Sequence, residues 1–281
     1  MNMKKSNSLA RLLMAATATC LTLSSCWNNT TSEKNEPDKI VYDTLNFEKM
    51  DSTFSTHAQA SFTANIIYPK QGPENLKRNI KEWTNEQLGG YYTYSLDTLE
   101  HVVDYYADML IKKAIEELDE YAERNVSYTY DWVIQPVYET PRSISYQVYN
   151  YNFTGGAHGG RYITYATFRK DDGRIFGWDM IKHDSIYAVR EMIRENIKTY
   201  FKVKTDEELK QYLFDGTNAY LFPLPVTPPV LTEEGVQFVY QQYEIAPYAA
   251  GNPTCTIPYE QIYSSLTSTA QQLTETEENE E

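Results

Sequence analysis

The sequence predicts an α+β fold in which antiparallel sheets pack against segregated helices, arranged as two small subdomains. Segments that are rich in Tyr, Val, Ile and Thr and alternate with period two are concentrated between residues 126 and 178. Segments with apolar residues at helical spacing lie before and after this block. Because strands and helices come in blocks and do not alternate one by one, a parallel α/β arrangement is disfavoured.

The first subdomain is expected to begin near Val41. Residues 61–69 alternate and then become apolar, which predicts a strand that ends at its proline. A helix should begin at Gly72-Pro73 and end at Gly89-Gly90, because proline fits the first helical turn and glycine ends helices. Its apolar positions share one face: Leu76, Ile80 and Trp83. A second, longer helix is expected over residues 98–124.

The middle of the chain predicts an antiparallel meander. Its four alternating segments are residues 126–138, 143–153, 161–168 and 174–178. Asp171-Asp172-Gly173 predicts a tight hairpin turn between the last two segments.

Helices and a second hairpin are expected in the C-terminal part. One helix should cover residues 186–200, and another should start at the capping box formed by Thr205 and Glu208. The remaining expected elements are a hairpin turn, two strands and a short helix, at residues 232–235, 236–243, 255–257 and 259–266.

The N-terminus resembles a bacterial lipoprotein signal. Three basic residues precede an apolar run at residues 12–23 that is too short to span a membrane. Leu23-Ser24-Ser25-Cys26 resembles the lipobox, in which the cysteine becomes the first mature residue and receives lipid. An ordinary signal peptide that happens to end near a cysteine is the alternative. We expect residues 1–25 to be the signal peptide, Cys26 the lipid anchor and residues 26–40 a flexible tether.

The chain is strongly acidic, with a formal net charge of −14. Loss of Lys4, Lys5 and Arg11 with the signal leaves 22 Lys and Arg against 39 Asp and Glu, a formal net charge of −17. This charge argues against nucleic acid as a partner and against a basic membrane-binding patch, and it permits attraction to cationic partners. Residues 269–281 are expected to form an acidic disordered tail.

The three cysteines limit the possible cysteine chemistry. Cys20 lies in the expected signal and Cys26 is the expected lipid site, so Cys255 remains and no intramolecular disulfide is expected in the mature chain. Cys255 lies in a strand-like run and is expected to be a buried core residue, not a nucleophile.

The loop at residues 154–160 is the clearest candidate for a site. It combines a histidine with four glycines, at Gly155, Gly156, His158, Gly159 and Gly160. Glycines allow close approach of a ligand to the backbone, and a histidine can bind or transfer a proton. The alternative is a glycine-rich connection whose histidine bonds the local backbone. The other histidines are isolated, so neither a metal site nor a cofactor is expected.

Motifs at both ends of the second half of the chain resemble a known family. They are Thr154–His158 with Asp171–Ile181 at the front, and Tyr243–Gly251 with Ile257-Pro258-Tyr259 at the end. Together they are similar to the RsiV-type C-terminal domain, domain of unknown function 3298, over about residues 145–268. Residues 55–140 resemble its companion, domain of unknown function 4163. We therefore expect domains at residues 41–142 and 143–268.

The resemblance implies a function at the cell envelope. Members include the extracellular part of a lysozyme-sensing anti-sigma factor, and others adjoin a peptidoglycan deacetylase domain. No transmembrane segment or deacetylase motif is recognised here, so signalling by regulated proteolysis and deacetylation are not expected.

The expected function is a membrane-anchored, periplasmic or surface-facing lipoprotein that binds peptidoglycan or a lysozyme-like cationic protein. Its site would be the glycine-rich loop, with Tyr248 and neighbouring tyrosines as a secondary choice. The 25 tyrosines fit either a binding surface or half-buried strands. An envelope hydrolase that uses His158 and a structural lipoprotein are the alternatives. The lack of a recognisable catalytic constellation favours binding over catalysis.

Overall fold

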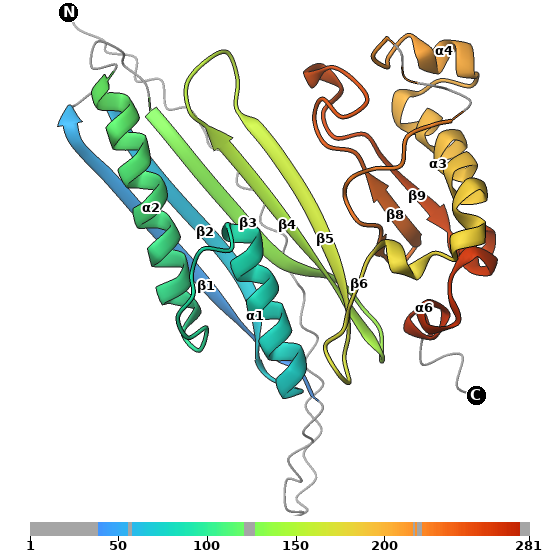
Figure 1. Cartoon of the computed structure of the whole chain (residues 1–281), viewed down its shortest axis with the longest axis horizontal. Coiled ribbons are helices and arrows are strands. Elements are labelled where there is room, and N and C mark those ends of the chain that lie inside the picture. Colours follow the sequence, from blue (N-terminus) through green and yellow to red (C-terminus); the bar gives the residue numbers. More distant parts are fainter. Residues whose placement is uncertain (1–38, 56–57, 121–126, 216, 218–220, 276–281) are drawn as a thin grey trace, which may run out of the picture. The chain divides into compact units, whose positions relative to one another are not determined.

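Six strands form one sheet in the order β1-β2-β3-β4-β5-β6 (Figure 1). The strands are β1 (Val41–Ser55), β2 (Ala58–Gln71), β3 (Ser127–Glu139), β4 (Ser143–Phe153), β5 (Gly160–Arg169) and β6 (Ile175–Phe176). The computed structural model describes residues 39–55, 58–120, 127–215, 217 and 221–275. Neighbouring strands are antiparallel except β2 and β3, which are parallel. The expected meander over β3 to β6 is confirmed.

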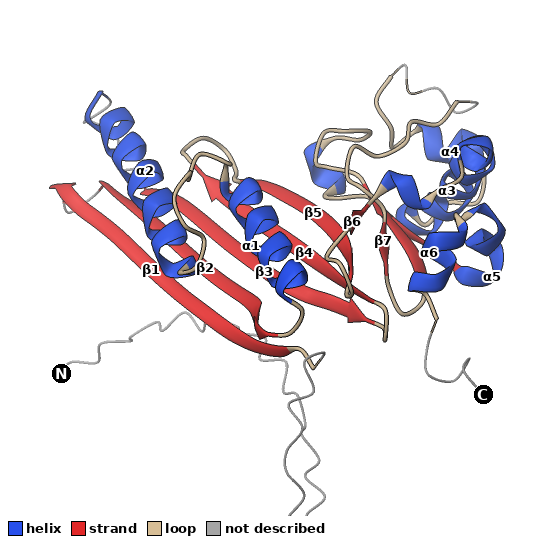
Figure 2. Ribbon diagram, turned by 60° about the horizontal axis from the view of Figure 1, so that its bottom comes forward, coloured by secondary structure: helices blue, strands red, loops and turns tan. Residues whose placement is uncertain are grey.

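Two helices, α1 (Glu74–Leu88) and α2 (Leu99–Glu120), lie on one face of this sheet (Figure 2). They occupy the crossover that the parallel β2–β3 pair requires. The predicted apolar face of α1 is buried, and Trp83 makes an edge contact with Phe168 of β5 at a ring-centroid distance of 5.7 Å. On β2, alternate residues such as Phe62 and Ile66 are fully buried in the same core.

A three-stranded antiparallel sheet with its own helices follows. Its strands are β7 (Val230–Leu231), β8 (Gly235–Val239) and β9 (Thr254–Pro258). The helices are α3 (Ile186–Phe201), α4 (Asp206–Lys210), α5 (Tyr259–Ile262) and α6 (Ser268–Leu273). The buried stripe of α3 packs with Phe238, Ile257 and Leu266 in a second core. The α+β class predicted from the sequence is confirmed.

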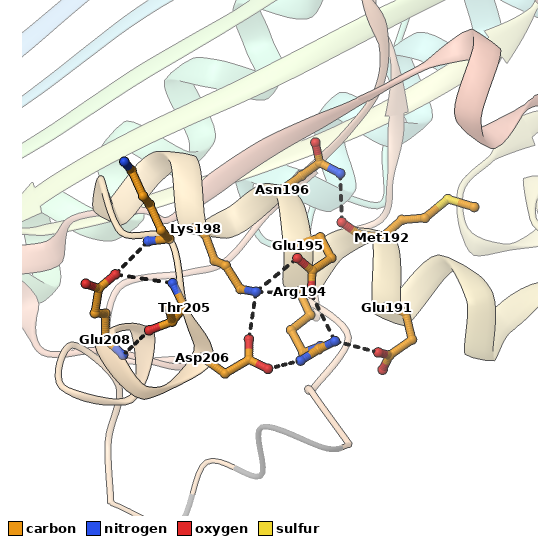
Figure 3. A network of polar contacts seen from close by, with 10 residues as sticks. Glu191, Met192, Arg194, Glu195, Asn196, Lys198, Thr205, Asp206 and Glu208 are labelled. Atoms are coloured by element: carbon orange, nitrogen blue, oxygen red, sulfur yellow. Dashed lines mark hydrogen bonds and ion pairs between the residues drawn. The ribbon is translucent and has the colours of Figure 1, made fainter.

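An ion-pair network joins α3 to α4 (Figure 3). Asp206 forms ion pairs with Arg194 and with Lys198, whose ammonium lies 2.8 Å from Asp206 Oδ1. The predicted capping box is present, because the Thr205 hydroxyl accepts from the Glu208 N–H and the Glu208 carboxylate accepts from the Thr205 N–H. These contacts hold a helix of only five residues in place.

Four features differ from the sequence-based expectations. The edge strand β1 was not expected as a strand. β2 continues past Pro69, which pairs with Tyr42 of β1 beside a β-bulge. β8 ends at Val239, because Gln241 and Glu244 form a turn closed by a bond from the Gln241 N–H to the Glu244 carboxylate. Part of the expected tail is helical.

The helix in the expected tail is α6. The Thr267 hydroxyl accepts from the Ala270 N–H at its start, and Ala270 and Leu273 are buried in the second core. The Leu273 carbonyl oxygen accepts from the hydroxyls of Thr140 and Ser143, in the β3–β4 turn. Two apolar residues three apart are enough to dock this turn of helix. Residues 276–281 lie outside the described residues.

The expected domain boundary at 142/143 falls in the turn between β3 and β4, so one sheet crosses it. The two cores divide later, since the first ends at Phe168 and the second begins at Phe176. The described residues form one compact unit. The expected signal, Cys26 and most of the tether lie outside the described residues. Within the part of the chain that is described, no helix is long and apolar enough to cross a membrane.

Candidate functional site

The glycine-rich loop connects β4 to β5, and its glycines serve different purposes. Gly155 and Gly156 have φ angles of 87° and 94°, a region that side chains other than glycine rarely adopt. Gly159 is buried, and a Cβ there would overlap the side chain of Tyr151. Gly160 begins β5, opposite Asn152. The backbone conformation of the loop therefore depends on glycine.

The second component is the loop between β8 and β9. Glu244 organises it, because its carboxylate accepts from the N–H groups of Gln241 and Val226, each at 2.7 Å. Tyr243 has a φ of 66°, which is uncommon for a residue with a side chain. Tyr248 begins a short 3₁₀ turn, Tyr248–Ala250.

The two loops meet at what we call the His–Tyr cluster: His158, Tyr243 and Tyr248. The His158 ring stacks on Tyr248, with centroids 3.6 Å apart and planes at 15°. The Tyr243 hydroxyl lies 3.2 Å from His158 Nε2, and His158 Nδ1 lies 3.3 Å from the Gly159 carbonyl oxygen. A carbonyl can only accept, so this geometry favours a proton on Nδ1 and a hydrogen bond from Tyr243 to Nε2.

Glutamine side chains fix the β8–β9 loop against β5. Gln242 accepts from the Arg161 N–H at 2.8 Å. Gln241 accepts from the Ile163 N–H at 3.1 Å, and its amide donates to the Ile163 carbonyl oxygen. The two amide side chains bond to the edge of β5 that does not pair with β4, where the backbone of another strand could otherwise bind. They position Tyr243 and Tyr248 beside the glycine-rich loop.

The structure brings two of the predicted site residues, His158 and Tyr248, into direct contact. Gly156 is exposed beside them, whereas Gly159 is buried and supports the loop from within. Sequence reasoning did not single out Tyr243, Gln241 or Gln242. Tyr243 lay within the motif that carried the family resemblance, but no spacing rule relates it to a histidine 85 residues earlier.

The cluster can offer stacking and hydrogen bonding. His158 is exposed, and Tyr243 is 54% exposed, so both are open to solvent. Aromatic rings with a hydroxyl or ring nitrogen combine flat apolar contact area with directional polar groups. Among the described residues, no group of three or more His, Cys, Asp or Glu side chains is arranged to hold a metal ion.

Cys255 lies away from solvent. It is buried, and burial raises the pKa of its thiol to about 12. The predicted burial of Cys255 is confirmed.

Comparison with known proteins gives one family. Residues 179–260 match the family described as "Protein of unknown function (DUF3298)". The chain contains a DUF3298 domain. This domain includes Tyr243 and Tyr248, while His158 lies before the matched residues. The companion domain expected over residues 55–140 stays a prediction. No curated protein matches the chain.

Two solved structures share the fold. A DUF3298 family member from Bacteroides fragilis NCTC 9343 has a TM-score of 0.72 and 22% sequence identity, covering 85% of this chain and 98% of that chain. A DUF3298 family protein from Pseudomonas aeruginosa PAO1 has a TM-score of 0.59 and 16% identity, covering 83% and 97% respectively. The likeness therefore extends well beyond the DUF3298 match into the six-stranded sheet.

Proposed function

We propose that this chain is a lipid-anchored cell-envelope binding protein whose ligand contacts the His–Tyr cluster. The observation that carries the proposal is the stack of His158 on Tyr248, with Tyr243 bonded to the same imidazole. Two loops from different sheets converge to form it. An exposed aromatic group held by such contacts presents a preorganised surface to a partner.

The ligand class follows from the resemblance to envelope proteins and from the chemistry of the cluster. Sugar rings present C–H faces that suit aromatic stacking and hydroxyls that suit the imidazole and phenol groups. This chemistry supports peptidoglycan as the first candidate ligand. The expected mature charge of −17 supports a basic, lysozyme-like protein as the second, because opposite charge speeds association.

The test is binding of soluble peptidoglycan fragments and of a basic muramidase to the full chain, at low and high salt. Tyr248→Ala and Tyr243→Ala should each weaken binding by about tenfold or more, as expected for aromatic residues at a binding centre. Tyr187→Ala is the matched control. Tyr187 is 64% exposed near the start of α3. It lies ~20 Å along the helix from Tyr200, which donates to the Ala250 carbonyl oxygen.

The outcomes separate the alternatives. Binding at the cluster is supported if the unaltered chain and Tyr187→Ala bind either ligand and the cluster variants do not. Salt should weaken the muramidase complex more than the peptidoglycan complex. Cleavage of the fragments would favour an envelope hydrolase. Absence of binding by the unaltered chain to both ligands would reject this ligand class.

A further inference from the structure

A pocket of about 380 Å³ lies between the end of β2, the first turns of α1 and the loop before α2. Its charged lining residues are Lys70, Lys77, Arg78, Lys81, Glu74 and Asp97. Four cations against two carboxylates give this lining a formal charge of +2, within a chain whose net charge is −14. Exposed charges are screened over ~8 Å at physiological salt, so the local groups decide what the pocket attracts.

The sequence of α1 explains the clustering. Lys77 and Lys81 are four residues apart, which places both on the same side of the helix, and Arg78 adjoins them. Lys70 approaches from the end of β2. No side chain caps the start of α1, so the positive end of its dipole adds to the potential there.

The four cations differ in how fully they are neutralised. Lys77 and Lys70 each lie close to a carboxylate, at 2.7 Å from Glu74 and 2.8 Å from Asp43. The Lys81 ammonium instead donates to the neutral carbonyl oxygen of Asp97, at 3.0 Å.

Arg78 is the fourth cation. Its guanidinium lies 3.8 Å from a Glu82 oxygen and donates to the Asn75 side-chain oxygen at 3.2 Å. Its side chain is 64% exposed. Arg78 and Lys81 therefore keep donors and positive charge for a ligand.

We propose that this pocket binds a phosphate group, with Arg78 and Lys81 as its main ligands. A guanidinium matches two oxygens of a phosphate at once, and an ammonium adds a compact charge. Lys77 and the start of α1 increase the attraction. The phosphate belongs either to a small soluble ester or to the headgroup of an anionic lipid.

The position of the pocket makes a headgroup accessible if the proposed anchor is correct. A Cβ at Gly72 would lie 3.3 Å from Ile40, so the first described residues adjoin the start of α1. The expected lipid site, Cys26, precedes Ile40 by 14 residues, which span at most ~50 Å when extended. The headgroup source rests on the proposed function, whereas the phosphate site does not.

The experiment uses the full chain carrying Cys26→Ala, so that no lipid anchor contributes. Inorganic phosphate is titrated by calorimetry, and co-flotation is measured with phosphatidylcholine vesicles with and without phosphatidylglycerol. Arg78→Ala/Lys81→Ala should weaken binding by at least about tenfold, since two charge-assisted hydrogen bonds are lost. Lys112→Ala/Lys113→Ala on α2 removes the same charge from exposed positions and should bind normally.

Each outcome decides the proposal. Phosphate binding that depends on Arg78 and Lys81 supports a soluble ester, and flotation that depends on both phosphatidylglycerol and these residues supports a headgroup. The proposal is overturned if the double variant binds as well as the unaltered chain, or if the control variant loses binding to the same extent. It is also overturned if the unaltered chain neither binds phosphate nor floats with the vesicles. If the double variant fails to fold by circular dichroism, Lys81→Gln replaces it with the same criteria. Failure to bind wall fragments would leave these results unaffected.

Discussion

At the residue scale, Gly159 leaves room for the Tyr151 ring, which packs against the glycine-rich loop of the candidate site. A Cβ at this position would overlap the Tyr151 ring, so an alanine must displace that ring. We expect Gly159→Ala to lower the free energy of unfolding by ~1–3 kcal/mol, the usual cost of overpacking. Urea denaturation measures this.

The matched test is a double-mutant cycle with Tyr151→Ala. Removing the ring relieves the overlap, so Gly159→Ala should cost less in the Tyr151→Ala background than in the unaltered chain. Strictly additive costs would show that the two residues do not compete for space.

Cys255 gives a second prediction at this scale. Its thiol is buried, lies 4.0 Å from the Ile193 carbonyl oxygen and has a raised pKa, so thiolate is scarce at neutral pH. A thiol reagent should label Cys255 only when the chain unfolds, and Cys255→Ser should cost about 1–3 kcal/mol. The unlabelled fraction is followed by mass spectrometry in native buffer and in urea. Rapid native labelling would contradict burial.

The candidate site was only partly predictable from single residues. Glycines around His158 marked the loop, because their conformational freedom is visible in sequence. The contact between His158 and Tyr243 could not be predicted from the sequence, because Tyr243 is 85 residues away and its position depends on the hydrogen bonds of Gln241 and Gln242 to β5. Such a contact depends on the placement of two sheets, which no local pattern encodes.

At the element scale, prolines and glycines at the ends of helices and strands made some elements predictable. α1 begins after Pro73 and ends just before Gly89, as expected, and β4 covers the predicted residues 143–153. β1 was not recognised, because it is an edge strand with polar residues through its length, including Asp43 and Glu48. Edge strands bury less surface, and their alternation is weaker.

The α3–α4 network predicts a pH dependence. Hydrogen bonding to Lys198, with the nearby charges of Lys198 and Arg194, holds the pKa of Asp206 below its ordinary value. A lowered folded-state pKa contributes stability above the unfolded pKa, and this contribution is lost as pH falls through the folded pKa. Asp206→Asn should therefore lower the free energy of unfolding by ~1–2 kcal/mol at pH 7, for a partly exposed network.

Urea denaturation across pH 2–7 checks this expectation. The difference in stability between the unaltered chain and Asp206→Asn should shrink as pH falls below about 4, where unfolded Asp206 protonates. It should vanish only once the pH passes below the lowered folded-state pKa of Asp206. Glu207→Gln is the control, because it removes a charge from the same helical turn at an exposed position. A constant difference between the unaltered chain and Asp206→Asn over the whole range would exclude an ionic contribution.

At the scale of the whole molecule, net charge and local charge lead to different expectations. The expected mature net charge of −17 argued against a basic surface, yet four cations line one pocket beside α1. The net charge is a sum over the whole chain, so it does not reveal a local cluster of cations. Positions i and i+4 of a helix lie on the same side, and in α1 this spacing brings cations together. Basic-protein binding at the His–Tyr cluster and phosphate binding beside α1 are therefore compatible proposals for different surfaces.

The proposed anchor determines where both surfaces act. If Cys26 carries lipid, Cys26→Ala should move the chain from the membrane fraction to the soluble fraction or block its maturation, because the acyl chains supply the membrane affinity. Fractionation with immunoblotting measures the distribution, and mass spectrometry of the mature N-terminus detects the lipid. Cys20→Ala is the matched control, since Cys20 lies within the expected signal and should be removed with it. Unchanged membrane retention of Cys26→Ala, with no lipid on the unaltered protein, would reject the anchor. The phosphate site would then have to be explained by a soluble ligand.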